Sequence, residues 1–376
     1  MSGVVQLGRL FGISIGVHFS WIFIFLLIAW SLASSYLPDE YPGWSTNTYW
    51  GVGAAASALL FVSVLIHELS HSLVATSRGR KVRGITLFFL GGVSEIEEES
   101  ANPSEEFWMS IAGPLTSFVL AAIFWGLFAA TSGTNPQLHA LASYLAFINL
   151  VLGVFNLLPA FPLDGGRVLR SLVWKATGSL EKANAIASTT GALAGFGFIA
   201  LGVYFVFVAS LTTGLWFVFI GWFIQSAASS FGRQQVTARA LSGKTVRDAM
   251  EEDFPVVPPG ITVQSLVDDY ITKEFQRTYV IALGSTFHGL VTLSDVKALP
   301  AEERLKNWVT AIMKKASQVI TAQPEEPLEV ALRRMISDDV RQLVVLDNGK
   351  PVGLLTRGDV LRVLEIAQIL PEQPSG

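Results

Sequence analysis

Three long stretches without a charged side chain place the strongest constraint on this chain. No Lys, Arg, Asp or Glu occurs in residues 49–66, 107–163 or 183–232. A helix of about 20 apolar residues crosses a bilayer, and a backbone in lipid must satisfy its own hydrogen bonds. The chain is 51% hydrophobic and 15% charged, a composition typical of integral membrane proteins. The sequence therefore predicts an α-helical polytopic membrane protein.

Clusters of turn residues divide these stretches into six predicted spans. Pro, Gly, Ser and Thr gather at residues 37–43, 131–136 and 210–214, where helices are expected to end. The predicted spans cover about residues 18–36, 49–77, 107–130, 138–158, 186–209 and 214–231. Residues 164–182 are predicted to form a loop. Gly191 and Gly195 form a Gly-x-x-x-Gly pattern, which marks either close helix packing or ordinary glycine in a span.

The basic residues within residues 1–240 all fall on one side of this six-span arrangement. They precede the first span, separate spans two and three and spans four and five, and follow the sixth. They are Arg9, Arg78, Arg80, Lys81, Arg83, Arg167, Arg170, Lys175, Lys182, Arg233 and Arg239. The positive-inside rule makes these loops cytoplasmic, so both termini are expected inside, in the cell membrane if the source is prokaryotic. No basic cluster precedes the first span, so no cleavable signal peptide is expected.

The connection between spans two and three contains a short apolar segment. Residues 85–93 are rich in β-forming residues, end in a glycine pair and are too short to span as a helix. They predict a short strand or a re-entrant hairpin, which lipid tolerates only where it is buried in protein or lines a cavity. An acidic run follows and is most simply a solvated loop: Glu95, Glu97, Glu98, Glu99, Glu105 and Glu106. Residues 1–17 are Gly-rich, and no regular element is predicted there.

A His-Glu-x-x-His pattern ends the second span. His67 and His71 are four residues apart and therefore lie on one face of a helix, where two imidazoles can bind one Zn²⁺. Glu68 is then placed to take a proton from a water that the metal activates. The competing interpretation is three polar residues packed between helices. Ionisable residues within a span cost roughly 2.5–3.5 kcal/mol each on insertion scales, so a functional role is favoured.

Asp164 is the predicted third ligand. The fourth span ends on the same side of the membrane as the second, and Asp164 follows directly after it. Two His, one carboxylate and an open position form a catalytic zinc set, and the chain has no cysteine to offer instead. Pro159 and Pro162 would interrupt the helix just before Asp164. Asp164 could otherwise be a turn residue before Gly-Gly.

These motifs resemble those of the site-2 protease family of intramembrane zinc metalloproteases. The matching pieces are residues 67–71, Asn156-x-x-Pro159-x-x-x-Leu163-Asp164-Gly165, and Ala112-Gly113-Pro114. The resemblance implies zinc held by His67, His71 and Asp164, with Glu68 as the general base. It also implies that Asn156 contacts the substrate or steadies the oxyanion, although an interhelical hydrogen bond is the alternative. Residues 85–93 look like the family's re-entrant β element, which pairs with an unwound substrate strand. His18 is either an active-site residue or a core histidine.

Charge is concentrated in the last third of the chain, which predicts a soluble α/β domain after the membrane part. Residues 241–376 carry 15 basic and 19 acidic side chains, against 11 of each in residues 1–240. Two similar units occur, at residues 241–301 and 302–366, with a tail at 367–376. They resemble a tandem pair of cystathionine-β-synthase-type (CBS) domains. The resemblance implies adenine-nucleotide sites at Thr292, Asp295, Thr356 and Asp359. The alternative role for these four residues is helix capping. The alternative role for the CBS pair is to form a homodimer.

The sequence therefore favours a zinc endopeptidase that cuts transmembrane protein substrates within or near a span in the lipid bilayer, modulated by its CBS pair. A CBS-gated transporter or channel would explain the spans and the tail but not Glu68 beside two histidines. A proteolytically inactive relative that binds membrane proteins would not need all four predicted active-site residues: His67, Glu68, His71 and Asp164. The net charge of −4 gives no reason to expect a nucleic-acid partner.

Overall fold

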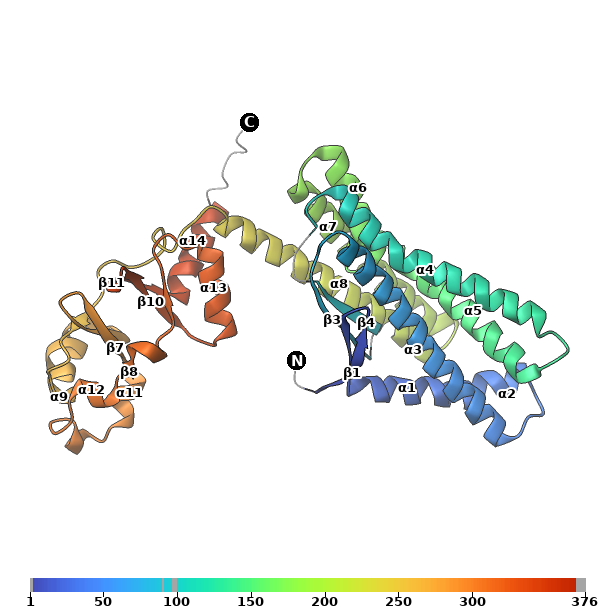
Figure 1. Ribbon diagram of the computed structural model, residues 1–376, viewed down its shortest axis with the longest axis horizontal. Helices are drawn as coiled ribbons and strands as arrows, with labels where there is room; N and C mark the ends of the chain where they lie inside the picture. The colour runs from blue at the N-terminus through green and yellow to red at the C-terminus, as the bar shows by residue number, and fades with distance from the viewer. Residues whose placement is uncertain (1–2, 90, 97–99, 370–376) are drawn as a thin grey trace. The chain divides into compact units, whose positions relative to one another are not determined.

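The computed structural model describes residues 3–89, 91–96 and 100–369 and divides the chain into two compact units, Met1–Arg233 and Gln234–Gly376. The first unit contains the long helices (Figure 1). Its helices are α1 (Ser20–Ser31), α2 (Leu37–Glu40), α3 (Thr46–Ser77), α4 (Pro103–Ala130), α5 (Pro136–Asn156), α6 (Asp164–Thr177) and α7 (Leu180–Val208), while α8 (Leu211–Leu241) continues into the second unit. A π-helical turn at Leu32–Tyr36 joins α1 to α2.

Within the described residues, six helices are long and apolar enough to cross a membrane. They are Ser20–Glu40, Thr46–Ser77, Pro103–Ala130, Pro136–Asn156, Leu180–Val208 and Leu211–Thr237. The six predicted spans are thus confirmed, with ends that differ by a few residues. Asparagine or serine caps set several of the starts: the side chains of Ser45, Asn102, Asn135 and Ser179 each accept a backbone N–H of the first turn.

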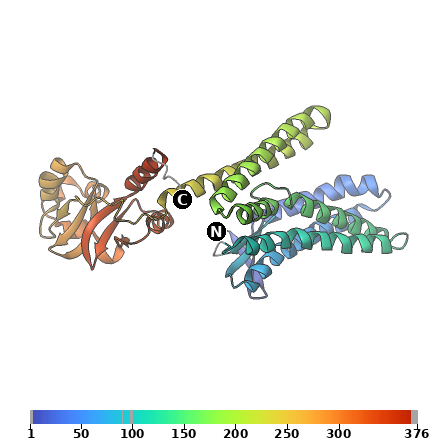
Figure 2. The ribbon, with the colours of Figure 1, turned by 90° about the horizontal axis from the view of Figure 1, so that it is seen from above.

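Helices α7 and α8 lie side by side (Figure 2), and glycines allow their close approach. A Cβ added at Gly195 would lie 2.6 Å from the backbone nitrogen of Gln225, and one at Gly191 would lie 2.9 Å from the Cβ of Ala228. Both contacts are too short for a side chain to remain without a shift. The close-packing interpretation of Gly191 and Gly195 is therefore the correct one.

A four-stranded sheet packs at the end of α3 that carries the two histidines. Its strands are β1 (Val4–Leu10), β2 (Ile13–His18), β3 (Val82–Phe88) and β4 (Gly91–Ile96), in the order β1-β2-β3-β4, with β2 and β3 parallel. Ile13, Ile15 and Ile85 are buried against Leu65 and Leu69 of α3. The sheet therefore packs against the face of α3 that carries Leu65 and Leu69.

The sequence prediction identified only half of this sheet. Strands β3 and β4 correspond to the predicted strand or hairpin at residues 85–93, whereas the hairpin β1–β2 was missed. Its turn is made by Phe11 and Gly12, both with positive φ (52° and 82°), which is the backbone of a type I′ turn. Phe11 is an unusual residue at such a position, so the turn carried no standard signal.

Two loop predictions were wrong. Residues 164–182 contain the 14-residue helix α6, which buries Gly165, Gly166, Arg170 and Ser171 on one side. Of the predicted acidic loop, Glu95 is exposed on β4, and Glu97, Glu98 and Glu99 lie outside the described residues. Glu105 and Glu106, however, stand in the first turn of α4 and are 5% and 0% exposed. Arginine partners far away in the sequence explain their burial and are described below.

The second unit contains two small sheets flanked by short helices. Its elements are β5 (Val256–Val257), α9 (Val263–Leu266), α10 (Thr272–Glu274), β6 (Thr278–Leu283), β7 (Thr286–Thr292), α11 (Leu293–Ala298), α12 (Val309–Ile312), β8 (Lys314–Lys315), β9 (Thr321–Ala322), α13 (Leu328–Ser337), β10 (Gln342–Asp347), β11 (Lys350–Thr356) and α14 (Arg357–Ile369). The sheet orders are β5-β6-β7-β8 and β11-β10-β9. The predicted soluble α/β domain is confirmed.

The two sequence repeats exchange their leading segments. Val246, from the start of the first repeat, is buried with Leu343 and Leu355 of the second. Val309, from the start of the second, is buried with Tyr279 and Val291 of the first. The backbone N–H groups of Val246 and Val309 donate to the carbonyls of Glu326 (2.9 Å) and Ile261 (3.0 Å). Each core therefore contains residues of both repeats, and the repeats fold as a pair.

Candidate metal centre

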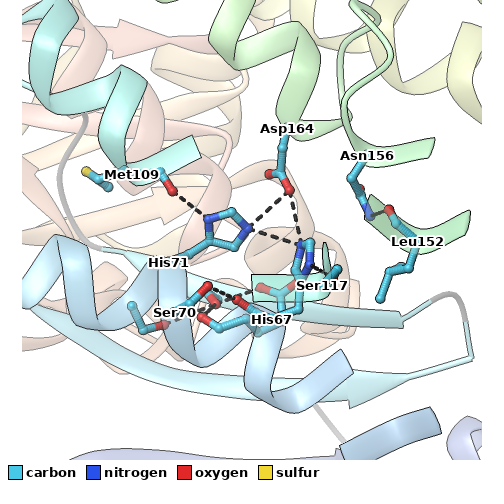
Figure 3. Close-up of polar contacts among 11 residues, drawn as sticks. His67, Ser70, His71, Met109, Ser117, Leu152, Asn156 and Asp164 are labelled. Carbon is cyan, nitrogen blue, oxygen red and sulfur yellow. Dashed lines mark hydrogen bonds and ion pairs between the residues drawn. The ribbon is translucent and has the colours of Figure 1, made fainter. Parts of the chain in front are cut away.

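His67 and His71 project from the same face of α3, one turn apart, and are 3% and 6% exposed (Figure 3). The helix runs unbroken for 32 residues from its Ser45 cap, so the two imidazoles share one rigid backbone. Their rings meet nearly edge to face, with centroids 4.9 Å apart. The i, i+4 spacing predicted from the sequence thus delivers two ring nitrogens to one point.

Asp164 reaches the same point from the start of α6. Helix α5 ends at Asn156, and the chain then turns through residues 157–163 before α6 begins. A Cβ on Gly165 would lie 2.3 Å from the carbonyl oxygen of Leu157, and one on Gly166 would lie 2.4 Å from the backbone nitrogen of Phe161. The glycine pair therefore lets α6 begin directly against this turn, which fixes the direction of the Asp164 side chain.

The three side chains converge with the spacing of a zinc site. The Oδ2 atom of Asp164 lies 3.1 Å from Nε2 of His67 and 3.1 Å from Nε2 of His71, and the two Nε2 atoms are 3.2 Å apart. Ligands bound tetrahedrally to Zn²⁺ at 2.0–2.1 Å are about 3.3–3.4 Å from one another. His67, His71 and Asp164 also form a group of possible metal ligands within the described chain. The observed spacing fits this ion.

Residues of α4 orient both imidazoles. The carbonyl of Met109 lies 2.6 Å from Nδ1 of His71; because a carbonyl can only accept, Nδ1 carries the hydrogen and Nε2 presents a lone pair. The hydroxyl of Ser117, which is fully buried, lies 2.8 Å from Nδ1 of His67 and can play the same part. Such outer hydrogen bonds fix the tautomer of metal-binding histidines.

Gly113 keeps the space in front of the two Nε2 atoms open. A Cβ at this position would lie 2.2 Å from Nε2 of His71 and 2.5 Å from Nε2 of His67. Any larger residue would therefore occupy the place of an ion or its open coordination position. In the sequence, Gly113 stands out only as part of a family motif, with no role of its own. Met109 and Ser117 do not stand out, since neither residue type has a distinctive pattern inside an apolar helix.

Glu68 lies beside the metal centre and against strand β4. The hydroxyl of Ser94 donates to its Oε2 (2.8 Å), and the hydroxyl of Ser72 donates to Ser94 (3.2 Å). A Cβ on Gly92 would lie 2.5 Å from Cγ of Glu68, so the strand approaches the carboxylate through a residue without a side chain. Among the described residues, β4 is the last strand of its sheet, and an edge strand presents backbone groups with which a further strand can pair.

Two other predicted residues lie in local hydrogen bonds. The amide nitrogen of Asn156 donates to the carbonyl of Leu152 one turn earlier in α5 (2.9 Å). Figure 3 shows this contact to the right of Asp164, away from His71. His18 ends β2, and its Nδ1 lies 2.8 Å from the hydroxyl of Ser20. Neither contact reaches the ligand cluster.

The four CBS residues form two equivalent helix caps. The Asp295 carboxylate accepts the N–H (2.8 Å) and hydroxyl (2.7 Å) of Thr292. Asp359 accepts the same groups of Thr356, at 2.9 and 2.6 Å. A third Thr-x-x-Asp turn occurs at Thr245 and Asp248, with distances of 2.7 and 3.0 Å. There, the backbone N–H and hydroxyl of Thr245 lower the pKa of the Asp248 carboxyl. The geometry thus accounts for the Thr and Asp side chains as caps, the alternative weighed from the sequence.

Comparison with known proteins identifies relatives of both units. Peptidase family M50 matches residues 55–139 and 134–199, and the CBS domain matches residues 309–366. Rip3 of Mycobacterium tuberculosis is 34% identical over 379 residues, covering 100% of this chain and 96% of Rip3. The zinc metalloprotease MJ0392 of Methanocaldococcus jannaschii is 27% identical over 374 residues, 99% of each chain. The solved site-2 protease from the same organism is 28% identical, with a TM-score of 0.41, over 61% of this chain and 95% of its own.

The substitution Gly113→Ala should remove the metal while leaving the helix intact. Its methyl group would overlap both Nε2 atoms, whereas Gly126 of the same helix has open space around it. Elemental analysis of the purified proteins should find about one zinc per chain in the parent and in Gly126→Ala, and well under half of that in Gly113→Ala. Full zinc occupancy in Gly113→Ala would contradict this placement of the ion.

Proposed function

The chain belongs to peptidase family M50, together with the site-2 proteases, and from this we propose that it is a zinc endopeptidase that cuts membrane-protein substrates within or near a transmembrane segment. The observation that carries the proposal is the 3.1–3.2 Å triangle of His67, His71 and Asp164 ligand atoms. Glu68 beside this triangle supports a hydrolytic role, because binding of a structural ion needs no adjacent carboxylate.

In this proposal the three ligands hold zinc, and Glu68 moves the proton. Bound zinc lowers the pKa of a water to about 7 and polarises a carbonyl. Glu68 takes the proton from the attacking water and returns it to the leaving nitrogen of the cleaved peptide. The hydroxyl of Ser94, 2.8 Å from Oε2, holds the carboxylate in place.

We propose that the substrate binds as a strand along β4. A peptide in a helix has its carbonyls hydrogen-bonded within the helix, so it must unwind before attack. In the described part of the chain, strand β4 is an edge of its sheet, and it contacts Glu68 through Gly92 and Ser94. A peptide added to this edge would satisfy its backbone hydrogen bonds while lying beside the base. Asn156 is proposed to contact the substrate or the developing oxyanion after it leaves the Leu152 carbonyl.

We further propose that both termini are cytoplasmic. The basic residues of the membrane unit precede α1, follow α3, lie on or beside α6 and end α8. The positive-inside rule places these connections in the cytoplasm. The metal centre then lies toward the cytoplasmic side, since His67 and His71 are in the last three turns of α3.

The CBS pair is proposed to modulate cleavage by binding an adenine nucleotide at Thr292, Asp295, Thr356 and Asp359. A nucleotide can bias the enzyme only through different affinities for two arrangements of the protein. Formation of a homodimer through the CBS pair is the alternative use of this unit, and the test below separates the two.

The substitution Glu68→Gln should abolish cleavage without loss of zinc. The amide keeps the shape of the side chain but cannot accept a proton, so the rate should fall by roughly 10²–10⁴-fold. His67→Ala and Asp164→Ala should lose zinc and activity together. Cleavage is followed on a tagged single-span membrane protein that the parent cuts, with zinc measured in the same preparations. If Glu68→Gln cuts at the parent rate, Glu68 is not the base.

Reporter insertions should establish the orientation. A phosphatase or fluorescent reporter inserted after Ser242 should report the cytoplasm, and one inserted after Gly43 the opposite side, because an odd number of spans separates the two positions. Both residues are exposed, so insertion should leave the fold intact. A cytoplasmic signal from the Gly43 insertion would reject this topology.

Calorimetry with AMP and ATP on the full chain should detect nucleotide binding. Asp359→Ala should weaken it roughly tenfold or more, through loss of hydrogen bonds to a charged group. Asp248→Ala is the matched control, because it removes the same pair of Thr-x-x-Asp hydrogen bonds in a turn outside the proposed nucleotide sites. The absence of heat with either nucleotide would leave dimerisation or substrate docking as the role of the CBS pair.

A further inference from the structure

Two adjacent glutamates at the start of α4 are buried charges that the zinc chemistry does not use. Glu105 and Glu106 are 5% and 0% exposed. A carboxylate removed from water is stable only with a charged partner and good hydrogen bonds. Each glutamate has an arginine partner, and the two arginines come from different parts of the chain.

Glu105 fixes the end of α3. Nε of Arg80 donates to its Oε1 at 2.7 Å, and the Nη2 atom donates to Oε2 at 3.2 Å. This two-pronged contact sets the angle as well as the distance between the groups. The backbone N–H of Arg80 in turn donates to the carbonyl of Ala75 (3.1 Å), in the last turn of α3. Ala75 is one turn beyond His71, so Glu105 ties the histidine-bearing helix to α4.

Glu106 fixes α6. Nε of Arg170 donates to its Oε1 at 2.7 Å, and Nη2 of Arg170 donates to the same oxygen. Nη1 of Arg170 donates to the side chain of Asn184 on α7 (3.2 Å), and the guanidinium lies 5.8 Å from the ring centre of Phe231 on α8. Arg170 belongs to the helix that begins with Asp164. The pair therefore ties the aspartate-bearing helix to α4.

Helix α4 is the common support of both contacts. Met109, one turn after the two glutamates, accepts the hydrogen bond of His71 and so orients a ligand from the same stretch of helix. We propose that Glu105 and Glu106 are positioning residues of the metal centre. Through Arg80 and Arg170 they hold α3 and α6 against α4, so that the histidines and Asp164 converge. This inference rests on the proposed zinc site.

Charged contacts suit this task because they fix direction as well as distance, and both meet in the first turn of α4. His67 and His71 are separated from Asp164 by 97 and 93 residues, and a triangle of 3.1–3.2 Å tolerates little sliding of one helix against another. Dispersion contacts are non-directional, whereas a guanidinium–carboxylate fork fixes distance and orientation. At Glu106 the contact differs from this fork, because Nε and Nη2 of Arg170 both donate to Oε1, while Nη1 donates to Asn184. A single ammonium nitrogen cannot reproduce this spread of donors, so Arg170→Lys keeps the charge and removes the geometry.

Zinc affinity and metal geometry test the proposal on the full chain in detergent. The variants are Arg170→Lys and Glu105→Gln, with Lys175→Gln as the control because Lys175 is exposed near the end of α6. Competition against a chromophoric chelator should show zinc binding weakened roughly tenfold or more in both variants, as for other outer-shell changes. The visible spectrum of the cobalt-loaded protein should change, and kcat should fall more than KM rises. Lys175→Gln should match the parent in all three.

Parent zinc affinity and an unchanged cobalt spectrum in the folded Arg170→Lys and Glu105→Gln proteins would overturn the proposal. If Arg170→Lys does not give a monodisperse protein, Glu105→Gln decides, because its partner Arg80 is more exposed than Arg170. A parent that binds no zinc would instead refute the proposed function. The two failures are therefore distinguishable.

Discussion

Three lone pairs that point at one another inside an apolar helix bundle are the constraint on which the rest of the membrane unit depends. Two imidazole nitrogens and a carboxylate oxygen at 3.1–3.2 Å repel unless a cation or a proton lies between them. Water is scarce in such a bundle, and unpartnered polar groups are costly there. The arrangement is stable because a cation can satisfy all three ligands at once and because hydrogen bonds to α4 hold the rings in place.

Helix α4 organises this cluster although it supplies no ligand. Met109 and Ser117 form hydrogen bonds with the Nδ1 atoms of the two histidines. Gly113 leaves open the space that faces their Nε2 atoms. Glu105 and Glu106 hold the neighbouring helices. These residues recur on the side of α4 that faces α3 and α6. The helix is thus a template for the site, while α3 and α6 deliver its reactive groups.

The two units are packed in different ways, because the first lies in lipid and the second in water. In the membrane unit, glycines allow backbones to approach where burial of apolar side chains gives no advantage over lipid. In the CBS pair, water drives apolar burial, and exchange of the leading segments places Val246 and Val309 in each other's repeat. At Thr292 and Thr356, Thr-x-x-Asp caps then end a strand and begin a helix, with the N–H and hydroxyl of each Thr donating to the Asp carboxylate.

The sequence by itself determined the elements whose physics is local. Uncharged length predicts the six spans, the i, i+4 spacing predicts that His67 and His71 share a face, and the repeat predicts the tandem α/β domain. What the tertiary structure alone decided is the partner of each polar group. The sequence predicts a solvated acidic loop at Glu105 and Glu106 because their partners Arg80 and Arg170 lie 25 and 64 residues away. It predicts a loop at residues 164–182 because charged side chains interrupt an apolar pattern there. Met109, Ser117 and Gly113 carry no signal until α3 packs beside them, since a carbonyl, a hydroxyl and a missing Cβ acquire a role only from the atom they face.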